Sequence, residues 1–249
     1  MPDSIKKILV IGDSCRDIFV YCSANRLCPD IPVPVLNVVK KTENDGMAMN
    51  LKRNLDSLLY TTNDIITNKN WKNVTKTRYM HLDSNHMFIR IDDGHEEIDR
   101  IDVFSIDFKK YDLIAISDYN KGFLTEQDIS YICNAHDNVL IDTKKIIGPY
   151  LNNVKYIKIN TPEYNASKNF ITENLENKII RTSGGEGCYF KSENYPVRKV
   201  EVIDVSGAGD TFFAGLLAKF AETEDIIKSI DFANYCASTV VQRRGVSII

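Results

Sequence analysis

The chain has 249 residues, of which 43% are hydrophobic and 26% charged, and its formal net charge is −3. This composition can fill a sizeable core and excludes a wholly disordered chain. The nearly neutral charge and the shortness of the Lys/Arg clusters argue against a nucleic-acid-binding or acidic-membrane-binding surface.

Nothing in the sequence predicts export or membrane insertion. Met1–Lys7 has no apolar stretch before a cleavage site, and no segment approaches the ~18 uninterrupted apolar residues of a membrane span. The six cysteines form no C-x-x-C pair, and the four histidines show no zinc-ligand spacing. We therefore expect a single cytoplasmic domain over residues 1–249 with reduced thiols and with neither membrane nor nucleic acid as a partner.

The N-terminal part predicts one buried strand and then a more exposed sheet. Lys6–Gly12 is a short apolar run rich in β-branched residues, and Asp13 follows at its C-terminal end. The later segments alternate polar and apolar residues, and Pro32 and Pro34 are typical of an edge sheet. The elements expected there are strands at 18–22 and 33–40, a helix at Met47–Leu59 and a strand pair within 74–92.

From residue 112 onward, strands and helices alternate. Thr125 can cap a helix, and Pro162 stands at a favoured first helical position. The alternation predicts an α/β fold, a doubly wound and mostly parallel sheet covered on both faces. The expected strands are 112–117, 138–142, 156–159, 178–182 and 197–204, and the expected helices are 125–135, a short one from Thr161 and a long helical region over 209–243.

The most informative segment is Asp204–Thr211, with the sequence DVSGAGDT, which an apolar helix follows. Two glycines that flank an alanine let backbone N–H groups converge without obstruction by side chains. They stand at a helix N-terminus, where free N–H groups and the dipole favour anions. Asp210 lies in the same turn and could accept a proton beside the anion, so the segment suits phosphoryl transfer.

A plainer interpretation is a helix start that uses glycine for a tight turn and Asp210 for the dipole. For a bare G-A-G-D the two interpretations are about equally favoured. The chain has no G-x-x-x-x-G-K-[ST] sequence, which excludes a P-loop. Gly12-Asp13-Ser14-Cys15 does not match G-x-G-x-x-G, so dinucleotide binding is disfavoured.

Val202–Gly215 (VIDVSGAGDTFFAG) closely resembles the C-terminal signature of the ribokinase-like, or PfkB, carbohydrate kinases. Further segments agree in order along nearly the whole chain and are similar to the heptose 7-phosphate kinases. These segments are Val10–Asp13 with Asp17, Arg26–Val35, Ser117–Gly122 (SDYNKG), Ile141–Lys144 (IDTK) and Phe232–Asn234. The resemblance implies a ribokinase-like fold with a small β lid and phosphorylation of a sugar or sugar phosphate by ATP with Mg²⁺. A requirement for a monovalent cation stays open.

The resemblance also implies site residues. Asp210 would be the catalytic base, and Glu163 would act on Mg²⁺ indirectly. The other implied roles are an anion hole at Gly207, Ala208 and Gly209, nucleotide contacts at Asn160, Glu163, Thr182, Gly184, Gly187 and Asn234, and substrate contacts at Asp13, Asp17, Gly46 and Asn50.

Three of these residues, and Lys121 of the SDYNKG segment, also have an interpretation without a functional role. Glu163 could be only a first-turn helix acid, and Asn234 a hydrogen-bonded core amide. Asp17 could be a surface charge on an edge strand, and Lys121 a solvated side chain beside a turn.

Three features depart from the family. Met47 replaces the second glycine of the Gly-Gly-Ala-x-Asn motif, which here is Gly46–Asn50, and we expect it to narrow the sugar pocket. The segment between Leu59 and Val74 is short and lacks a G-x-D-x-x-G turn and a helix–strand unit. The sequence ends at Ile249, and we expect no nucleotidyltransferase domain in it. A compact, divergent kinase is the expectation.

The leading hypothesis is a kinase for a heptose 7-phosphate-type substrate. Alternatives are a kinase for another sugar or a nucleoside, and a non-catalytic sugar- or nucleotide-binding protein. We expect lid strands near 17–40 and 74–92 to cover the sugar and exclude water. Because lid strands present open edges, they could also pair two chains into a homodimer.

Overall fold

The computed structural model describes residues 6–59, 62–84 and 86–249. Residues 1–5, most of the segment considered for an export signal, lie outside this range, as do residues 60 and 61 of the shortened segment. Within the described part, no helix is long and apolar enough to cross a membrane.

The chain builds an eight-stranded main sheet in the order β12-β11-β10-β9-β8-β7-β1-β4. Neighbours from β10 to β4 pair in parallel, and β11 and β12 add an antiparallel edge. This sheet confirms the predicted α/β class. Its strands are β1 (Ile8–Gly12), β4 (Asp64–Ile66), β7 (Leu113–Asp118), β8 (Val139–Thr143), β9 (Tyr156–Asn160), β10 (Ile179–Thr182), β11 (Cys188–Phe190) and β12 (Glu193–Tyr195).

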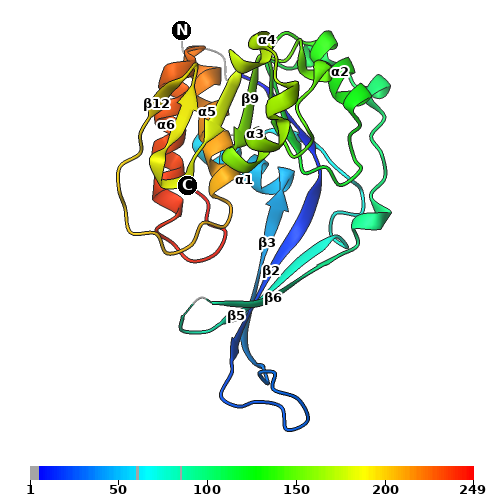
Figure 1. Cartoon of the computed structure of the whole chain (residues 1–249). Coiled ribbons are helices and arrows are strands. Elements are labelled where there is room, and N and C mark those ends of the chain that lie inside the picture. The colour runs from blue at the N-terminus through cyan, green and yellow to red at the C-terminus, as the bar shows by residue number, and fades with distance from the viewer. Residues whose placement is uncertain (1–5, 60–61, 85) are drawn as a thin grey trace.

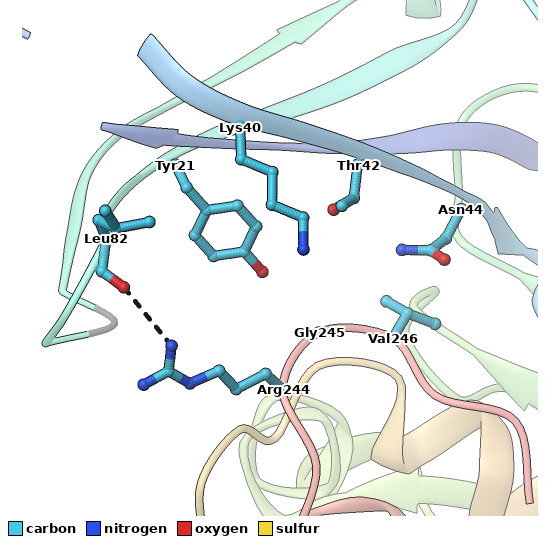
Figure 2. A pocket seen from close by; sticks show the side chains of 8 residues that line it. All are labelled: Tyr21, Lys40, Thr42, Asn44, Leu82, Arg244, Gly245 and Val246. Atoms are coloured by element: carbon cyan, nitrogen blue, oxygen red, sulfur yellow. Dashed lines mark hydrogen bonds between the residues drawn. The ribbon is translucent and has the colours of Figure 1, made fainter. Parts of the chain in front are cut away.

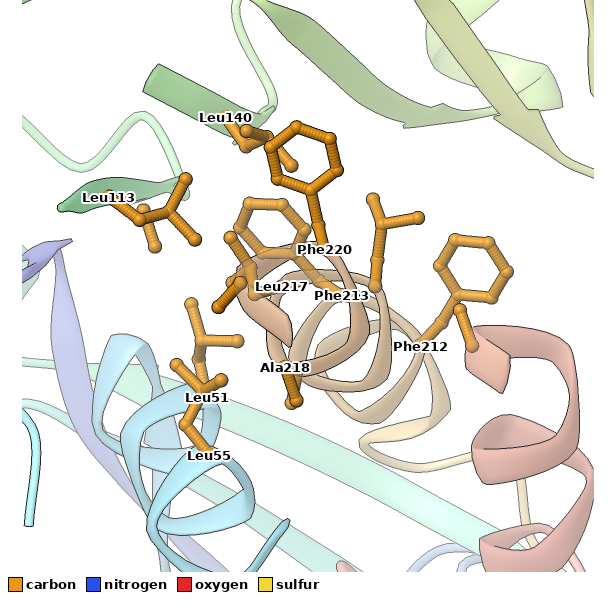
Figure 3. Close-up of a cluster of buried hydrophobic side chains, with 14 of the residues drawn as sticks. Leu51, Leu55, Leu113, Leu140, Phe212, Phe213, Leu217, Ala218 and Phe220 are labelled. Carbon is orange, nitrogen blue, oxygen red and sulfur yellow. The ribbon is translucent and has the colours of Figure 1, made fainter. Parts of the chain in front are cut away.

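Helices cover both faces of the main sheet. Because side chains alternate along a strand, Ile8 and Val10 of β1 pack on one face, whereas Leu9 and Ile11 pack on the other. The first face meets α1, α5 and α6, and Figure 3 shows α5 at the centre of that cluster. The helices are α1 (Ala48–Leu59), α2 (Glu126–Ala135), α3 (Thr161–Ser167), α4 (Glu173–Glu176), α5 (Ala208–Thr223) and α6 (Ile226–Val240).

A second, four-stranded sheet projects from the body, and we call it the lid (Figure 1). Its order is β3-β2-β5-β6, and its central pair, β2 with β5, is parallel. The strands are β2 (Ser14–Ser23), β3 (Asn37–Met47), β5 (Thr75–His81) and β6 (Met87–Asp93). β2 and β3 are longer than expected and join the lid directly to β1 and α1.

Three sequence expectations need correction. Residues 197–204 form no strand, because Val197, Val200 and Val202 line a cavity instead of pairing in a sheet. The helical region over 209–243 is two helices, since Glu224 adopts a left-handed φ of 53° and Asp225 caps α6. The short segment after α1 still supplies a strand, β4, which pairs in parallel with β1.

Candidate active site

The start of α5 lies at the centre of the candidate site. Gly207 precedes the helix with a φ of 78°, a left-handed conformation that favours glycine. A Cβ at Gly209 would stand 3.2 Å from Lys158 Nζ, so glycine lets the lysine approach the first turn. Ala208 N–H donates to Val205 O at 3.2 Å. The helix N-terminus and the lysine together favour an anion here.

Asp210 is held in the first turn of α5 by two long-range hydrogen bonds. Asn50 Nδ2 donates to Oδ2 at 2.8 Å, and the Tyr119 hydroxyl donates to Oδ1 at 2.7 Å. The residue is 6% exposed. Burial raises the pKa of the Asp210 carboxyl above its ordinary value, and the two hydrogen bonds partly oppose that rise. A fixed carboxylate with a raised pKa is suited to accept a proton.

Asp210 faces a cavity of about 400 Å³ between the lid and the body, which we call the lid cavity. The lid contributes Asp17 and Arg78, which form an ion pair. The body contributes Tyr119, and its ring carries Lys76 Nζ at 4.7 Å from the centroid. The remaining lining residues are Met47, Asp142, Lys144, Lys158, Asn160, Thr182, Val205, Ser206, Gly207, Gly209, Asp210 and Val246.

A second cavity, of about 410 Å³, lies on the other side of the α5 start, and we call it the turn cavity. Gly184 and Gly187 of the turn after β10 line it, together with valines of residues 197–205 and Asn234 of α6. Gly187 has a φ of 93°, and a Cβ there would meet Tyr195 O at 2.1 Å. The Asn234 amide donates to Tyr195 O at 3.0 Å, so at least one of its hydrogens ties α6 to β12.

The two cavities meet at the start of α5. Thr182, Val205 and Gly209 line both of them. Two ligands, one in each cavity, would therefore approach each other at the start of α5.

Sequence reasoning missed a set of charged residues on the floor of the lid cavity. Lys158 Nζ donates to Asp142 Oδ2 at 2.6 Å, and both side chains are buried. Lys144 pairs with Glu163 and lies 3.8 Å from Asp142 Oδ1. A lysine within the buried strand β9 was the available signal, because an inward lysine needs a partner or a ligand.

Asn160 and Glu163 form a reciprocal cap at the start of α3. Asn160 Oδ1 accepts from Glu163 N at 2.9 Å, and Glu163 Oε2 accepts from Asn160 N at 2.8 Å. Asn160 lines the lid cavity, whereas Glu163 does not. The plainer interpretation of Glu163 as a first-turn helix acid therefore describes its contacts, and any action of Glu163 on a metal would be indirect.

Two of the expected substrate ligands lie behind the cavity wall. Asp13 is fully buried, and its carboxylate accepts from Tyr119 N at 2.7 Å and from Phe123 N at 3.4 Å. It fastens the loop that carries Tyr119 and does not line the lid cavity. A Cβ at Gly46 would meet Asp17 Oδ2 at 2.4 Å, so Gly46 makes room for the Asp17 carboxylate. The direct sugar contacts of Asp13 and Gly46 stay predictions, and the contacts present here support the Tyr119 backbone and the Asp17 carboxylate.

Met47 lines the lid cavity, as the expected narrowing requires. It has a φ of 62°, the left-handed region that favours glycine, and it is 2% exposed. Its side chain packs with Cys15 and Val74 and touches Tyr119 from the cavity edge. α1 begins directly after it at Ala48.

The described residues also fit a metal-bound nucleotide. Asp142 Oδ1 is buried without a hydrogen-bond partner, in a cavity whose floor carries Lys144 and Lys158. No cluster of three or more His, Cys, Asp or Glu side chains could hold a metal ion by itself within the described ranges. A carboxylate oxygen with no hydrogen-bond partner suits a Mg²⁺ ion that takes most of its ligands from phosphate and water.

Curated relatives match almost all of this chain. It is 29% identical over 300 residues to the bifunctional protein HldE of Helicobacter pylori (strain HPAG1), which covers 97% of this chain and 64% of the relative. It is 30% identical over 295 residues to the bifunctional protein HldE of Aliarcobacter butzleri (strain RM4018), with coverages of 96% and 61%. The chain thus spans less than two thirds of the length of these relatives.

Solved structures share the fold. A ribokinase from Thermotoga maritima superposes with a TM-score of 0.75 at 16% identity, over 97% of this chain and 94% of that one. A nucleoside kinase from Methanocaldococcus jannaschii gives 0.71 at 16% identity, over 97% and 93%.

The family assignment follows from the sequence profile of the pfkB family carbohydrate kinases, which matches residues 53–249. That range contains Asp210, the glycines before it and both lysines of the cavity floor. The chain belongs to the pfkB carbohydrate kinase family.

Proposed function

We propose that the protein transfers the γ-phosphoryl group of ATP to a hydroxyl of a sugar phosphate of the heptose 7-phosphate type. The observation that carries the proposal is the meeting of the two cavities at the start of α5. ATP in the turn cavity would direct its phosphates toward Gly209, and an acceptor in the lid cavity would lie against Asp210. The heptose-type acceptor is supported by the resemblance of Arg26–Val35 and Ser117–Gly122 to heptose 7-phosphate kinases.

Asp210 accepts the proton of the attacking hydroxyl. Asn50 and Tyr119 hold its two oxygens from opposite sides, and this fixes the carboxylate plane. The raised pKa makes Asp210 a better proton acceptor than an exposed aspartate. Removal of the proton turns the hydroxyl into a stronger nucleophile toward the phosphorus atom.

The γ-phosphoryl group develops negative charge on its equatorial oxygens during transfer, and positive charge in the site stabilises it. The N-terminus of α5 supplies backbone dipoles, and Lys158 supplies an ammonium next to Gly209. Asp142 holds Lys158 in place, so the charge is preorganised before the reaction begins.

Asp142 and Asn160 are the residues that would hold Mg²⁺ with its water ligands, and Glu163 would act only through Asn160 and Lys144. When bound, the ion supplies charge neutralisation between the phosphate groups.

The lid would keep water from replacing the sugar as the acceptor of the phosphoryl group. Asp17 and Arg78 cover the acceptor side of the lid cavity, and an acceptor that binds them would exclude solvent from Asp210. Because Gly46 has no side chain, the Asp17 carboxylate has room to lie against the Gly46 backbone.

Formation of ADP from MgATP, measured with a panel of sugars, sugar phosphates and nucleosides, tests the proposal. We expect the largest stimulation from a heptose 7-phosphate and a loss of about 10²–10⁴-fold in kcat for Asp210→Asn. Binding of ligands without turnover would favour a non-catalytic binding protein. Preferential turnover of a nucleoside or of an unphosphorylated sugar would contradict the acceptor class.

A further inference from the structure

A third cavity, of about 280 Å³, lies outside the site described above, and we call it the Arg244 groove. Figure 2 shows Tyr21, Lys40, Thr42 and Asn44 extending from the lid toward the loop that carries Arg244. Leu82, Gly245 and Val246 complete the lining. The two walls of the groove therefore belong to different parts of the fold.

The groove carries positive charge and many hydrogen-bond donors. None of its eight lining residues is acidic, whereas Lys40 and Arg244 both enter it. Within the described ranges no ion pair involves either cation, and Arg244 bonds only weakly to the Leu82 and Asp83 carbonyl oxygens, at 3.5 and 3.4 Å. Two cations with hydroxyl and amide neighbours form a site for an oxyanion.

One carboxylate lies nearby and is already engaged. Asp204 accepts from Ser206 N and from Gly245 N, each at 2.9 Å. Its charge helps to raise the pKa of the Tyr21 phenol, after the larger effect of burial. Tyr21 therefore keeps its proton and can donate a hydrogen bond to a ligand.

The groove is a neighbour of the lid cavity. Val246 lines both. Along the lid, the pair Asp17–Asn44 borders the lid cavity side, and the pair Tyr21–Lys40 lies four residues further along β2, about 13 Å at a rise of about 3.3 Å per residue. A ligand that extends from Asp210 past Val246 would reach Lys40 and Arg244.

We propose that the Arg244 groove is a subsite for a phosphate group at the far end of the acceptor. The proposal rests on the proposed function for the position of the reacting hydroxyl. Lys40 would bind the phosphate from the lid and Arg244 from the body. The phosphate would therefore connect the two walls and hold the lid closed over Asp210, so that a distal charge on the acceptor favours the closed site.

The test uses the full chain, matched pentose, hexose and heptose sugars with and without a terminal phosphate, and isothermal titration calorimetry. The variants are Lys40→Met, Arg244→Leu and their combination. Lys41→Met is the matched control, because Lys41 pairs with Glu43 and does not line the groove. Formation of ADP is measured in parallel, and inorganic phosphate serves as a competing probe.

We expect each groove variant to weaken binding of the sugar phosphate by about tenfold to a hundredfold, and to leave binding of the parent sugar unchanged. Inorganic phosphate should compete with the sugar phosphate in wild type and not in the double variant. The Lys41→Met control should behave as wild type.

Equal losses for phosphorylated and unphosphorylated sugars, or no loss for either, would overturn the subsite. Inorganic phosphate that binds without competing against the sugar phosphate would mean a separate anion site and would also overturn it. A phosphate-specific loss of binding without any ADP formation would support the subsite and contradict the proposed function alone.

Discussion

The body side and the lid side of the candidate site are assembled in different ways. On the body side, residues that act together are close in sequence, such as Gly207–Asp210 and the cap between Asn160 and Glu163. The partners within the lid, and the α1 residue that holds Asp210, come from distant segments: Arg78 and Asp17 are 61 residues apart, and Asn50 and Asp210 are 160 apart.

This difference matches two tasks of the site: binding of the phosphate groups and recognition of the acceptor. A helix N-terminus with glycines binds phosphate in any chain that folds it, so local sequence determines it. Recognition of an acceptor depends on the relative placement of the lid and the body, which tertiary packing sets. We therefore expect body-side changes to affect catalysis and stability strongly, and lid-side changes to affect acceptor binding and assembly.

The largest effect is expected for Lys158→Met on the body side. Removal of the lysine leaves Asp142 as a buried charge without its partner, which costs about 3–5 kcal/mol of unfolding free energy. Phosphoryl transfer should also fall sharply. Urea unfolding and ADP formation are the two measurements.

The double variant Lys158→Met/Asp142→Leu provides the control. It should recover much of the lost stability, because an apolar pair of similar size can replace a buried ion pair, and it should not recover activity. A Lys158→Met variant as stable as wild type would show that the loss of Lys158 does not leave Asp142 as an uncompensated buried charge.

Much of the body side could be predicted from the sequence. The start of the helix at Asp210 and the strands β1, β7, β8, β9 and β10 follow from motifs and from apolar runs. Residues 197–204 could not be assigned correctly, because alternating valines fit a strand and a cavity wall equally well. The break at Glu224 was missed because no glycine marks it, although Asp225 is a recognisable helix cap.

The contacts between distant segments were beyond sequence reasoning. Nothing local in Ser117–Gly122 shows that the Tyr119 hydroxyl reaches Asp210 or that Asp13 holds the Tyr119 backbone. The resemblance implies a sugar contact for Asp13, and local sequence does not show that the nearby loop also donates to both of its oxygens. Such contacts arise only when distant loops pack together.

The next largest effect is expected for the pairing of two chains through the lid. Met87, Ile89 and Ile91 alternate on β6, an edge strand, and each is about half exposed. We predict a homodimer that buries this face, and we predict that Ile89→Lys/Ile91→Lys dissociates it. Sedimentation equilibrium at micromolar concentration measures the state, and a monomeric wild type would contradict the prediction.

Tyr119→Phe should change the pH dependence of the reaction. The Tyr119 hydrogen bond stabilises ionised Asp210 and lowers its pKa, against the larger effect of burial. Without the hydroxyl the pKa of Asp210 rises further, so the acid limb of the kcat/KM profile should move to higher pH by about one unit. A loss of activity that is the same at every pH would indicate a packing role only.

The smallest effect is expected for Met47→Gly. The change widens the lid cavity, so kcat/KM for the acceptor should rise a few-fold and KM for ATP should stay constant. Met47→Ala separates the effect of cavity width from that of backbone strain: it removes most of the side chain but keeps a Cβ at a φ of 62°, which costs about 1 kcal/mol of stability relative to glycine. Equal changes in the ATP and acceptor parameters would refute the narrowing.

The central claim is that ATP and the acceptor meet directly beside Asp210, which takes a proton and never the phosphoryl group. The stereochemical course at phosphorus tests it, with ATP made chiral by oxygen isotopes at the γ-phosphate and the sugar phosphate that gives the fastest turnover. Direct in-line transfer predicts inversion of configuration. Retention would mean two successive transfers through a phosphorylated residue and would contradict the role of Asp210 as a base.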